Sequence, residues 1–392
     1  MKIGIFSETY EPFVSGVTTS IKMLKEALEN MGHDVFIVTV NLKKYRFHYD
    51  KKNKIIYIPG MKTKIYDARL TGIYSRRAFK IIKSWHLDII HSQTEFGIGV
   101  FSRIVSKKLN IPVIHTYHTL YEDYVYYVTH NHFNNFGKKV VKKFTKYFCE
   151  KKCDGLIVPT DKIKDLFINK YHIKKEINVI PTGIDTEKFK LTPKIKKEIE
   201  KLKKEYHLKK DDFIIGSVGR IATEKSFDSL IESSKELIKE NKKIKIIIVG
   251  DGPELEHLKE LSKNLKIDKN VIFTGKVKYD LIPSFYNLFD IVVSFSTTET
   301  QGLTIIEALA SGKPVLCIND ESFQKMITSS YNGYLFKDRK EYQKLVKKIM
   351  ESSTLYHYLS NNAYQSVKEY SKETFGKRVL EVYKKAIRNS RK

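Results

Sequence analysis

The feature that most constrains the fold is an alternation of short apolar runs with helix-like stretches, repeated in both halves of the chain. Runs rich in β-branched residues, such as KIGIF at 2–6 and FIIGSV at 213–218, are typical of buried strands. Alternation of this kind predicts an α/β fold with a parallel, doubly wound sheet, and two such series predict two Rossmann-like domains. Ligands of these sheets bind at the carboxyl ends of the strands. The predicted strands are 2–6, 35–40, 55–58, 88–91, 112–116 and 155–158, then 213–218, 244–249, 271–274, 290–295 and 314–318.

The length of 392 residues suits two domains of ordinary size. A turn signal at Pro181-Thr182-Gly183 marks the boundary between them. We expect one domain over 1–185, a second over 186–370 and an amphipathic helix over 371–392. The Lys/Glu-rich segment 193–207 has few apolar residues and is expected to be a solvated connector.

Basic residues dominate the charge. The 71 Lys and Arg outnumber the 45 Asp and Glu, which leaves a net charge of +26 and favours anionic partners. Three cysteines without a paired framework indicate a reducing compartment. No apolar run approaches the roughly 18 residues of a membrane span, and the N-terminus differs from a signal peptide. We therefore expect a cytoplasmic protein that would work on lipid only from the membrane surface.

One stretch, SFSTTETQGLTIIEALASGKP at 294–314, carries two carboxylates with seven residues between them, Glu299 and Glu307. Glu299 is expected in a loop that follows a strand, and Glu307 in the first turns of the next helix. Between them the N–H groups of Gly302, Leu303 and Thr304 would face an anion such as a diphosphate. A surface loop followed by a dipole-stabilised helix fits the same residues.

Two other strand–helix loops carry candidate ligand contacts. Gly16 would let the backbone approach a ligand closely, although a plain turn fits equally well. Arg220 and Lys225 follow a predicted strand, where two cations would neutralise a diphosphate. In a chain with 71 basic residues, chance placement near a glycine is the alternative.

The spacing Glu-x7-Glu followed by ALASGKPV resembles the signature of the fourth family of retaining glycosyltransferases, and TTETQGLT resembles its diacylglycerol glucosyltransferases. The resemblance implies the two-domain GT-B fold, with a cleft between the domains and a last helix that crosses back to the first domain. It implies that Glu299 contacts the donor sugar and Glu307 the donor ribose. It also favours phosphate contacts for Gly16, Arg220 and Lys225.

His118 follows the predicted strand 112–116 in HTYHTLYEDY, which also resembles the lipid glucosyltransferases. It could donate to a sugar hydroxyl or to the scissile oxygen. A core histidine and a metal site with His115 and its neighbours are alternatives. We expect no metal, because a companion acid at helical spacing is lacking and GT-B enzymes generally need none. The resemblance places the acceptor near three residues, Glu122, Asp123 and Tyr124.

Two basic stretches predict a membrane-binding surface. Residues 41–83 hold thirteen Lys or Arg against two acids, a net of +11. Aromatic and apolar residues recur at helical spacing over 133–148 with lysines between them, as in an interfacial helix. An ordinary helix packed on its own domain is the alternative. The predicted membrane contacts are Phe133, Phe136, Lys138, Lys139, Lys142, Lys143, Phe144 and Lys146.

The resemblance thus implies a retaining hexosyltransferase that moves glucose from UDP-glucose to diacylglycerol, on the inner face of an anionic membrane, without a cofactor. Related enzymes acting on phosphatidylinositol, a glycolipid or a soluble glycan are the alternatives within the family. A basic nucleic-acid-binding protein is the alternative outside it. Nucleic acid is not an expected partner, because no nucleic-acid-binding motif is present.

Overall fold

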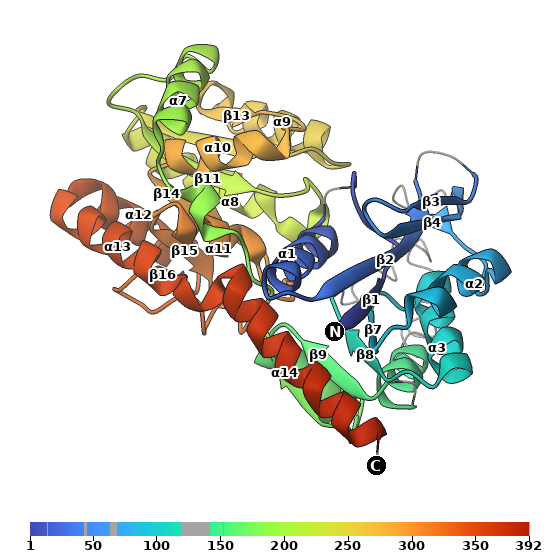
Figure 1. Ribbon diagram of the computed structural model, residues 1–392. Coiled ribbons are helices and arrows are strands. Elements are labelled where there is room, and N and C mark those ends of the chain that lie inside the picture. The colour runs from blue at the N-terminus through green and yellow to red at the C-terminus, as the bar shows by residue number, and fades with distance from the viewer. Residues whose placement is uncertain (14, 43–44, 63–68, 119–141, 152, 392) are drawn as a thin grey trace. The chain divides into compact units, whose positions relative to one another are not determined.

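The computed structural model describes all residues except 14, 43–44, 63–68, 119–141, 152 and 392 (Figure 1). The chain forms two compact units. Unit 1 contains Met1–Gly183 and Lys372–Lys392, and unit 2 contains Ile184–Ser371. The chain therefore leaves unit 1 once and returns to it with its last helix.

Unit 1 is built on an eight-stranded sheet in the order β10-β9-β8-β7-β1-β2-β4-β3. All neighbouring strands are parallel except β3 and β4. Since β1 lies between β2 and β7, the strand order reverses at β1, and loops that leave β1 and β7 diverge there. The strands are β1 (Lys2–Phe6), β2 (Asp34–Asn41), β3 (His48–Asp50), β4 (Ile55–Pro59), β7 (Ile89–Ser92), β8 (Val113–Thr116), β9 (Gly155–Val158) and β10 (Ile177–Val179), with a separate β5 (Met61–Lys62) and β6 (Arg69–Leu70) pair.

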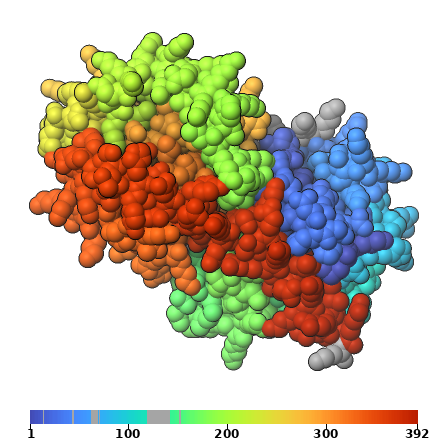
Figure 2. All heavy atoms as spheres, turned by 60° about the vertical axis from the view of Figure 1, so that its left-hand side comes forward, coloured from blue at the N-terminus to red at the C-terminus, as the bar shows by residue number. Residues whose placement is uncertain are grey.

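Helices cover both faces of this sheet. On one face α1 and α14 share a core with Ile3 and Ile5, and on the other α2 and α3 share a core with Phe6 and Ile90. In the space-filling view the red α14 lies beside N-terminal residues in blue, and its Lys372 bonds Glu26 at 3.0 Å (Figure 2). The helices are α1 (Gly16–Asn30), α2 (Arg76–Trp85), α3 (Gly97–Leu109), α6 (Asp161–Asp165) and α14 (Lys372–Ser390), with π-helical turns at Tyr147–Lys151 and Leu166–Lys170.

Unit 2 is a six-stranded, fully parallel sheet in the order β13-β12-β11-β14-β15-β16. The first and fourth strands along the unit, β11 and β14, are neighbours, which is the order of a doubly wound nucleotide-binding sheet. The strands are β11 (Phe213–Val218), β12 (Ile244–Val249), β13 (Val271–Phe273), β14 (Ile291–Ser294), β15 (Val315–Ile318) and β16 (Gly333–Phe336).

The prediction of a solvated connector at 193–207 is wrong. This segment forms α7 (Pro193–Glu205), whose Ile195, Ile199 and Leu202 are buried in the core of unit 2. Spacings of four and three residues put these side chains on one face, so few apolar residues suffice to pack the helix. The other helices are α8 (Phe227–Glu240), α9 (Leu255–Asn264), α10 (Ile282–Leu288), α11 (Leu303–Ala310), α12 (Arg339–Glu351) and α13 (Ser353–Ser366), with a 3-10 turn at Thr223–Lys225.

Candidate active site

In unit 2 the predicted site residues meet where the strand order reverses. Arg220 and Lys225 follow β11, and Glu299 follows the neighbouring β14. Lys225 Nζ lies 2.5 Å from Glu299 Oε1, although the two residues are 74 positions apart. Their side chains are 26% and 15% exposed, so this ion pair is open to a ligand from one side. Arg220 is exposed on the same loop.

Hydrogen bonds fix the loop that carries Glu299. Ser296 Oγ and Thr298 Oγ1 both donate to the Glu224 carbonyl, at 3.1 and 3.0 Å. Ser322 Oγ donates to the Glu299 carbonyl at 2.6 Å. The loops after β11, β14 and β15 are therefore tied together, which positions the carboxylate before any ligand binds.

The start of α11 supplies the predicted backbone donors. Gly302 precedes the helix with φ of 77°, and a Cβ added there would lie 2.7 Å from the Phe323 ring, so glycine is required for two reasons. Ile305 N donates to the Gly302 carbonyl at 3.0 Å, which is the first bond of the helix. The N–H groups of Gly302, Leu303 and Thr304 precede that bond at the positive end of the helix dipole.

Glu307 lies one turn further along α11 and is buried. Its Oε2 accepts a 2.9 Å hydrogen bond from the Tyr286 hydroxyl on α10. Burial raises the pKa of Glu307 to about 7, against the opposing effect of the tyrosine bond. The Tyr286 bond orients the carboxyl group, and the sequence gives no sign of this partner 21 residues away.

The raised pKa of Glu307 predicts a pH-dependent effect on stability. An acid whose pKa is raised by folding destabilises the fold as pH rises from its ordinary value of 4.5 through about 7. We expect Glu307→Gln to stabilise the protein at pH 8, by an amount on the order of 3 kcal/mol, and to change little at pH 5. Calorimetric melting at both pH values measures this. Glu236→Gln, on an exposed glutamate of α8, is the control. Equal effects at pH 5 and pH 8 would contradict the assignment.

In unit 1 the predicted residues also lie at the carboxyl edge of the sheet. Gly16 opens α1 after β1, and Ser15 caps that helix by accepting a bond from Thr18 N at 3.2 Å. His118 follows β8, and its Nε2 lies 2.6 Å from Gln93 Oε1. Burial, with a smaller effect of His115, lowers the pKa of His118 to about 3. His118 is therefore a neutral imidazole over the physiological pH range.

Behind His118 lies a buried polar network. His115 Nδ1 donates to the Ser92 carbonyl at 3.1 Å, and its Nε2 lies 3.0 Å from Glu95 Oε1. Without a proton Nε2 and Oε1 would both be acceptors, so one proton lies between them. His91 bonds both Tyr383 of α14 and Thr116, at 2.6 and 2.7 Å. These bonds make His91 and His115 core histidines, and they fix the ends of β7 and β8.

The expected acceptor residues Glu122, Asp123 and Tyr124 lie outside the described residues. Phe133, Phe136, Lys138 and Lys139 lie outside them as well. The described end of that segment is helical from 142 and packs through Thr145, Phe148 and Cys149, which are buried.

The other side chains of that helical end face outward. Phe144 and Tyr147 are 39% and 51% exposed, and Lys143 is exposed too. Lys142 is half-buried. Lys146 differs, because its Nζ donates to the His172 carbonyl at 3.0 Å and holds the helix on its own unit.

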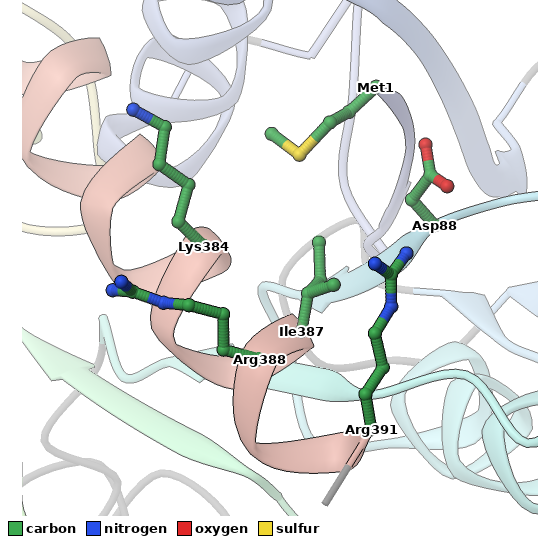
Figure 3. Close-up of a pocket in the computed structure, with 6 residues that line it drawn as sticks. All are labelled: Met1, Asp88, Lys384, Ile387, Arg388 and Arg391. Atoms are coloured by element: carbon green, nitrogen blue, oxygen red, sulfur yellow. The ribbon is translucent and has the colours of Figure 1, made fainter.

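A cavity of about 360 Å³ lies at the opposite edge of the sheet in unit 1 (Figure 3). Met1 and Asp88 precede β1 and β7 there, and the Arg391 side chain of the C-terminal segment points toward Asp88. The cavity is thus separated from His118 by the length of the strands. Within the described ranges, no group of three His, Cys, Asp or Glu side chains could hold a metal ion. No helix among the same residues is long and apolar enough to span a membrane.

Comparison with known proteins shows the family to which the chain belongs. Residues 14–188 match glycosyltransferase family 4, and residues 198–366 match glycosyl transferases group 1. The chain is 38% identical to the alpha-monoglucosyldiacylglycerol synthase of Streptococcus pneumoniae, over 99% of its own length and 86% of that protein. The chain therefore belongs to the same glycosyltransferase family as this synthase. The corresponding synthase of Acholeplasma laidlawii is 35% identical, over 98% and 96% of the two chains.

Solved structures confirm that the glycosyltransferase has the GT-B fold. Anabaena HepE, in complex with UDP-glucose, matches with a TM-score of 0.75 and 18% identity, over 98% of this chain and all of that one. Sucrose-phosphate synthase of Thermosynechococcus elongatus matches with a TM-score of 0.76, also at 18% identity, over 99% of each chain. At this identity the likeness extends to the fold and no further.

Proposed function

We propose that this glycosyltransferase transfers glucose from UDP-glucose to the free hydroxyl of diacylglycerol, with retention of the α configuration, at an anionic membrane surface. The observation that carries the proposal is its 38% identity, over 99% of the chain, to an alpha-monoglucosyldiacylglycerol synthase. The side chains at the carboxyl edges of both sheets have the chemistry that such a transfer needs.

Unit 2 would bind the nucleotide sugar. Breaking the bond between glucose and UDP leaves negative charge on the diphosphate. Arg220, Lys225 and the N–H groups at the start of α11 would stabilise that charge. Glu307, oriented by Tyr286, would accept hydrogen bonds from the ribose hydroxyls. Glu299 would contact the glucose.

The Lys225–Glu299 ion pair has a specific role in this account. It holds both side chains in place while the site is empty. A partly exposed ion pair contributes only about 0–1 kcal/mol, so Lys225 can exchange Glu299 for a phosphate at little cost. Glu299 then becomes available to a sugar hydroxyl. Donor binding would thus release the carboxylate that the transfer requires.

Unit 1 would supply His118 and would bind the diacylglycerol acceptor. A neutral His118 can form hydrogen bonds with a sugar without adding positive charge. We propose that the proton of the acceptor hydroxyl passes to the leaving phosphate, since no base stands out in the sequence. The acceptor contacts proposed for Glu122, Asp123 and Tyr124 belong to the same step.

Donor and acceptor panels test the proposal. Purified protein is incubated with radiolabelled UDP-glucose, UDP-galactose or GDP-mannose, and with vesicles that contain diacylglycerol, phosphatidylinositol or neither. Label is expected in lipid only when UDP-glucose and diacylglycerol are both present. Transfer to phosphatidylinositol, or from another donor at an equal rate, would contradict it.

We further propose that transfer needs no metal ion. The described cations of the site, Arg220 and Lys225, can neutralise the diphosphate themselves. EDTA is expected to leave the initial rate of glucosyl transfer within about twofold of its untreated value. Loss of activity in EDTA, with recovery on addition of a divalent ion, would refute this part of the mechanism.

The exposed apolar residues support the membrane part of the proposal. Unit 1 carries eight of the eleven large, exposed hydrophobic side chains among the described residues. Three of them lie near α3. The Tyr74 ring lies 5.8 Å from the Phe101 ring of that helix, Phe96 precedes the helix, and the Phe144 ring contacts Phe148, which packs on Gly99. Aromatic side chains with lysines beside them suit a lipid headgroup region.

Charge reversal tests this surface. Each basic residue near an anionic leaflet contributes about 1 kcal/mol. Replacing Lys142 and Lys143 by Glu is therefore expected to weaken binding to phosphatidylglycerol vesicles at least about tenfold while sparing UDP binding. Co-sedimentation over a graded anionic content measures it, and high salt should reverse the electrostatic part. The control reverses Lys196 and Lys197, exposed on α7 of unit 2. Equal binding by both double variants would mean that another surface docks.

A further inference from the structure

Gln93, directly after β7, forms a hydrogen bond with the ring of His118. The residue is 2% exposed, and its Oε1 lies 2.6 Å from His118 Nε2. A carbonyl oxygen only accepts hydrogen bonds, so Nε2 of His118 carries the hydrogen. For a neutral imidazole, this contact determines which nitrogen is protonated and how the ring is turned.

The backbone that carries Gln93 is itself held on both sides. Thr94 Oγ1 accepts a bond from Glu8 N at 3.0 Å, and Glu8 Oε1 accepts one from Ile98 N at 2.5 Å. The next residue, Glu95, contacts His115 at 3.0 Å. The connection between β7 and α3 is therefore tied to the ends of β1 and β8, and Gln93 has a fixed base from which to orient His118.

The amide nitrogen of Gln93 indicates that this residue does not serve the stability of the fold. Its Nε2 is buried and has no hydrogen-bond partner among the described residues. A buried donor without a partner destabilises a fold, and an apolar side chain of the same size would avoid that loss. A methionine has a similar length without the amide, so it would remove the unpaired donor but could not fix the His118 ring.

We propose that Gln93 is a positioning residue for glucosyl transfer, whose side-chain oxygen fixes the ring orientation and the Nε2–H tautomer of His118. The proposal rests on the proposed function, in which His118 contacts the donor sugar. Gln93 acts through His118 and has no contact of its own with the reacting atoms. A neutral amide suits this role because it leaves the imidazole uncharged.

The first test separates positioning from folding. Gln93→Met is expected to lower kcat about tenfold, the loss of one oriented hydrogen bond, with the melting temperature unchanged or higher and the KM for UDP-glucose within about threefold. Tyr49→Phe is the control. It removes the hydroxyl to which Nε1 of the buried Trp85 donates a 3.1 Å hydrogen bond, elsewhere in unit 1. Wild-type kcat in folded Gln93→Met, or an equal loss in Tyr49→Phe, would overturn the proposal.

A second test uses pH. His118 is uncharged in the wild type. The described titratable groups around it are His115 on β8 with its partner Glu95, His91 on β7, and Arg103 on α3. Arg103 lowers the pKa of His91 and of His115. In Gln93→Glu a carboxylate replaces the amide and favours the imidazolium, so the pKa of His118 rises. Activity of this variant should fall as pH falls from 8 to 5.5, on a limb that the wild type lacks. Parallel profiles would count against positioning.

The third readout needs no turnover. In protein labelled with ¹⁵N-histidine, with His118→Gln identifying the signal, the wild-type ring is expected as a single Nε2–H tautomer and the Gln93→Met ring as a mixture. An unchanged tautomer in Gln93→Met would overturn the proposal. If the wild type transfers no glucose to diacylglycerol, the proposed function fails, while this spectrum still decides whether Gln93 fixes His118.

Discussion

Glu299→Gln is expected to lower the rate of glucosyl transfer at least about a hundredfold, the size of effect that follows loss of one preorganised polar contact to the transition state. The amide keeps the volume of the side chain, and its oxygen can still accept from Lys225, 2.5 Å away in the wild type. The loop should therefore keep its place, since the bonds from Ser296, Thr298 and Ser322 involve other atoms. The measured quantities are kcat on diacylglycerol vesicles and UDP affinity by calorimetry.

The control for this variant is Glu236→Gln. Glu236 is an exposed glutamate of the same unit that also pairs with a lysine, Lys239 at 3.0 Å, but it lies on α8. We expect wild-type turnover from it, and UDP affinity within about threefold of wild type from both variants. Near wild-type turnover by folded Glu299→Gln would remove the carboxylate from the mechanism.

Arg220→Ala and Lys225→Ala are each expected to weaken UDP binding about tenfold to a hundredfold. A charge-assisted hydrogen bond contributes about 1.5–3 kcal/mol, and each variant removes one from the diphosphate. Lys225→Ala carries an added effect, because it leaves the 15%-exposed Glu299 carboxylate without its cation. Repulsion between that carboxylate and the diphosphate should make Lys225→Ala the more damaging change.

A double variant separates the two contributions. In Lys225→Ala with Glu299→Gln the repelling charge is gone, so UDP affinity should partly recover relative to Lys225→Ala alone. Lys239→Ala, which removes an exposed lysine of α8, is the matched control and should bind UDP normally. Unchanged UDP affinity in both Arg220→Ala and Lys225→Ala would place the diphosphate elsewhere.

Strand periodicity predicted most of both sheets. Short runs such as 2–6 and 213–218 are apolar on consecutive residues, because strands in the middle of a covered parallel sheet are buried on both faces. The expected domains ended at 185 and 370, and the two units of the structure divide after 183 and after 371. Of the four edge strands of the two main sheets, β13 was predicted at 271–274, whereas β3, β10 and β16 were not. β13 (VIF) is apolar throughout, but β3 (HYD) and β10 (INV) contain polar residues and β16 (GYLF) begins with glycine, so these short runs carry no clear strand pattern.

The arrangement of the candidate site was predictable where its residues are close in sequence. Glu299, Gly302 and Glu307 share one strand–loop–helix segment, so their spacing alone indicates a common edge. The Lys225–Glu299 pair and the Tyr286–Glu307 bond span 74 and 21 residues. Such contacts depend on which strands and helices become neighbours, and a single sequence does not specify this. Gln93 was missed for the same reason, since it meets His118 only across β7 and β8.

The end of the segment 133–148 that the structure describes, from 142 onwards, shows what periodicity leaves undetermined. The pattern predicted one apolar face, and this described end has two. Phe148 and Cys149 pack inward, while Phe144 and Tyr147 are exposed. Periodicity therefore predicted the helical spacing of this described end without indicating which of its side chains are buried.

The structure of the lipid product tests the proposed glucosyl transfer most directly. The protein is incubated with UDP-[¹³C]glucose and vesicles of diacylglycerol with phosphatidylglycerol, the lipid is extracted, and the labelled glucose is examined by NMR. We expect one glucose joined to the free glycerol hydroxyl with the α configuration, and no such product from Glu299→Gln. A β-linked glucose, a label on any other lipid, or equal product from Glu299→Gln would contradict the proposed transfer.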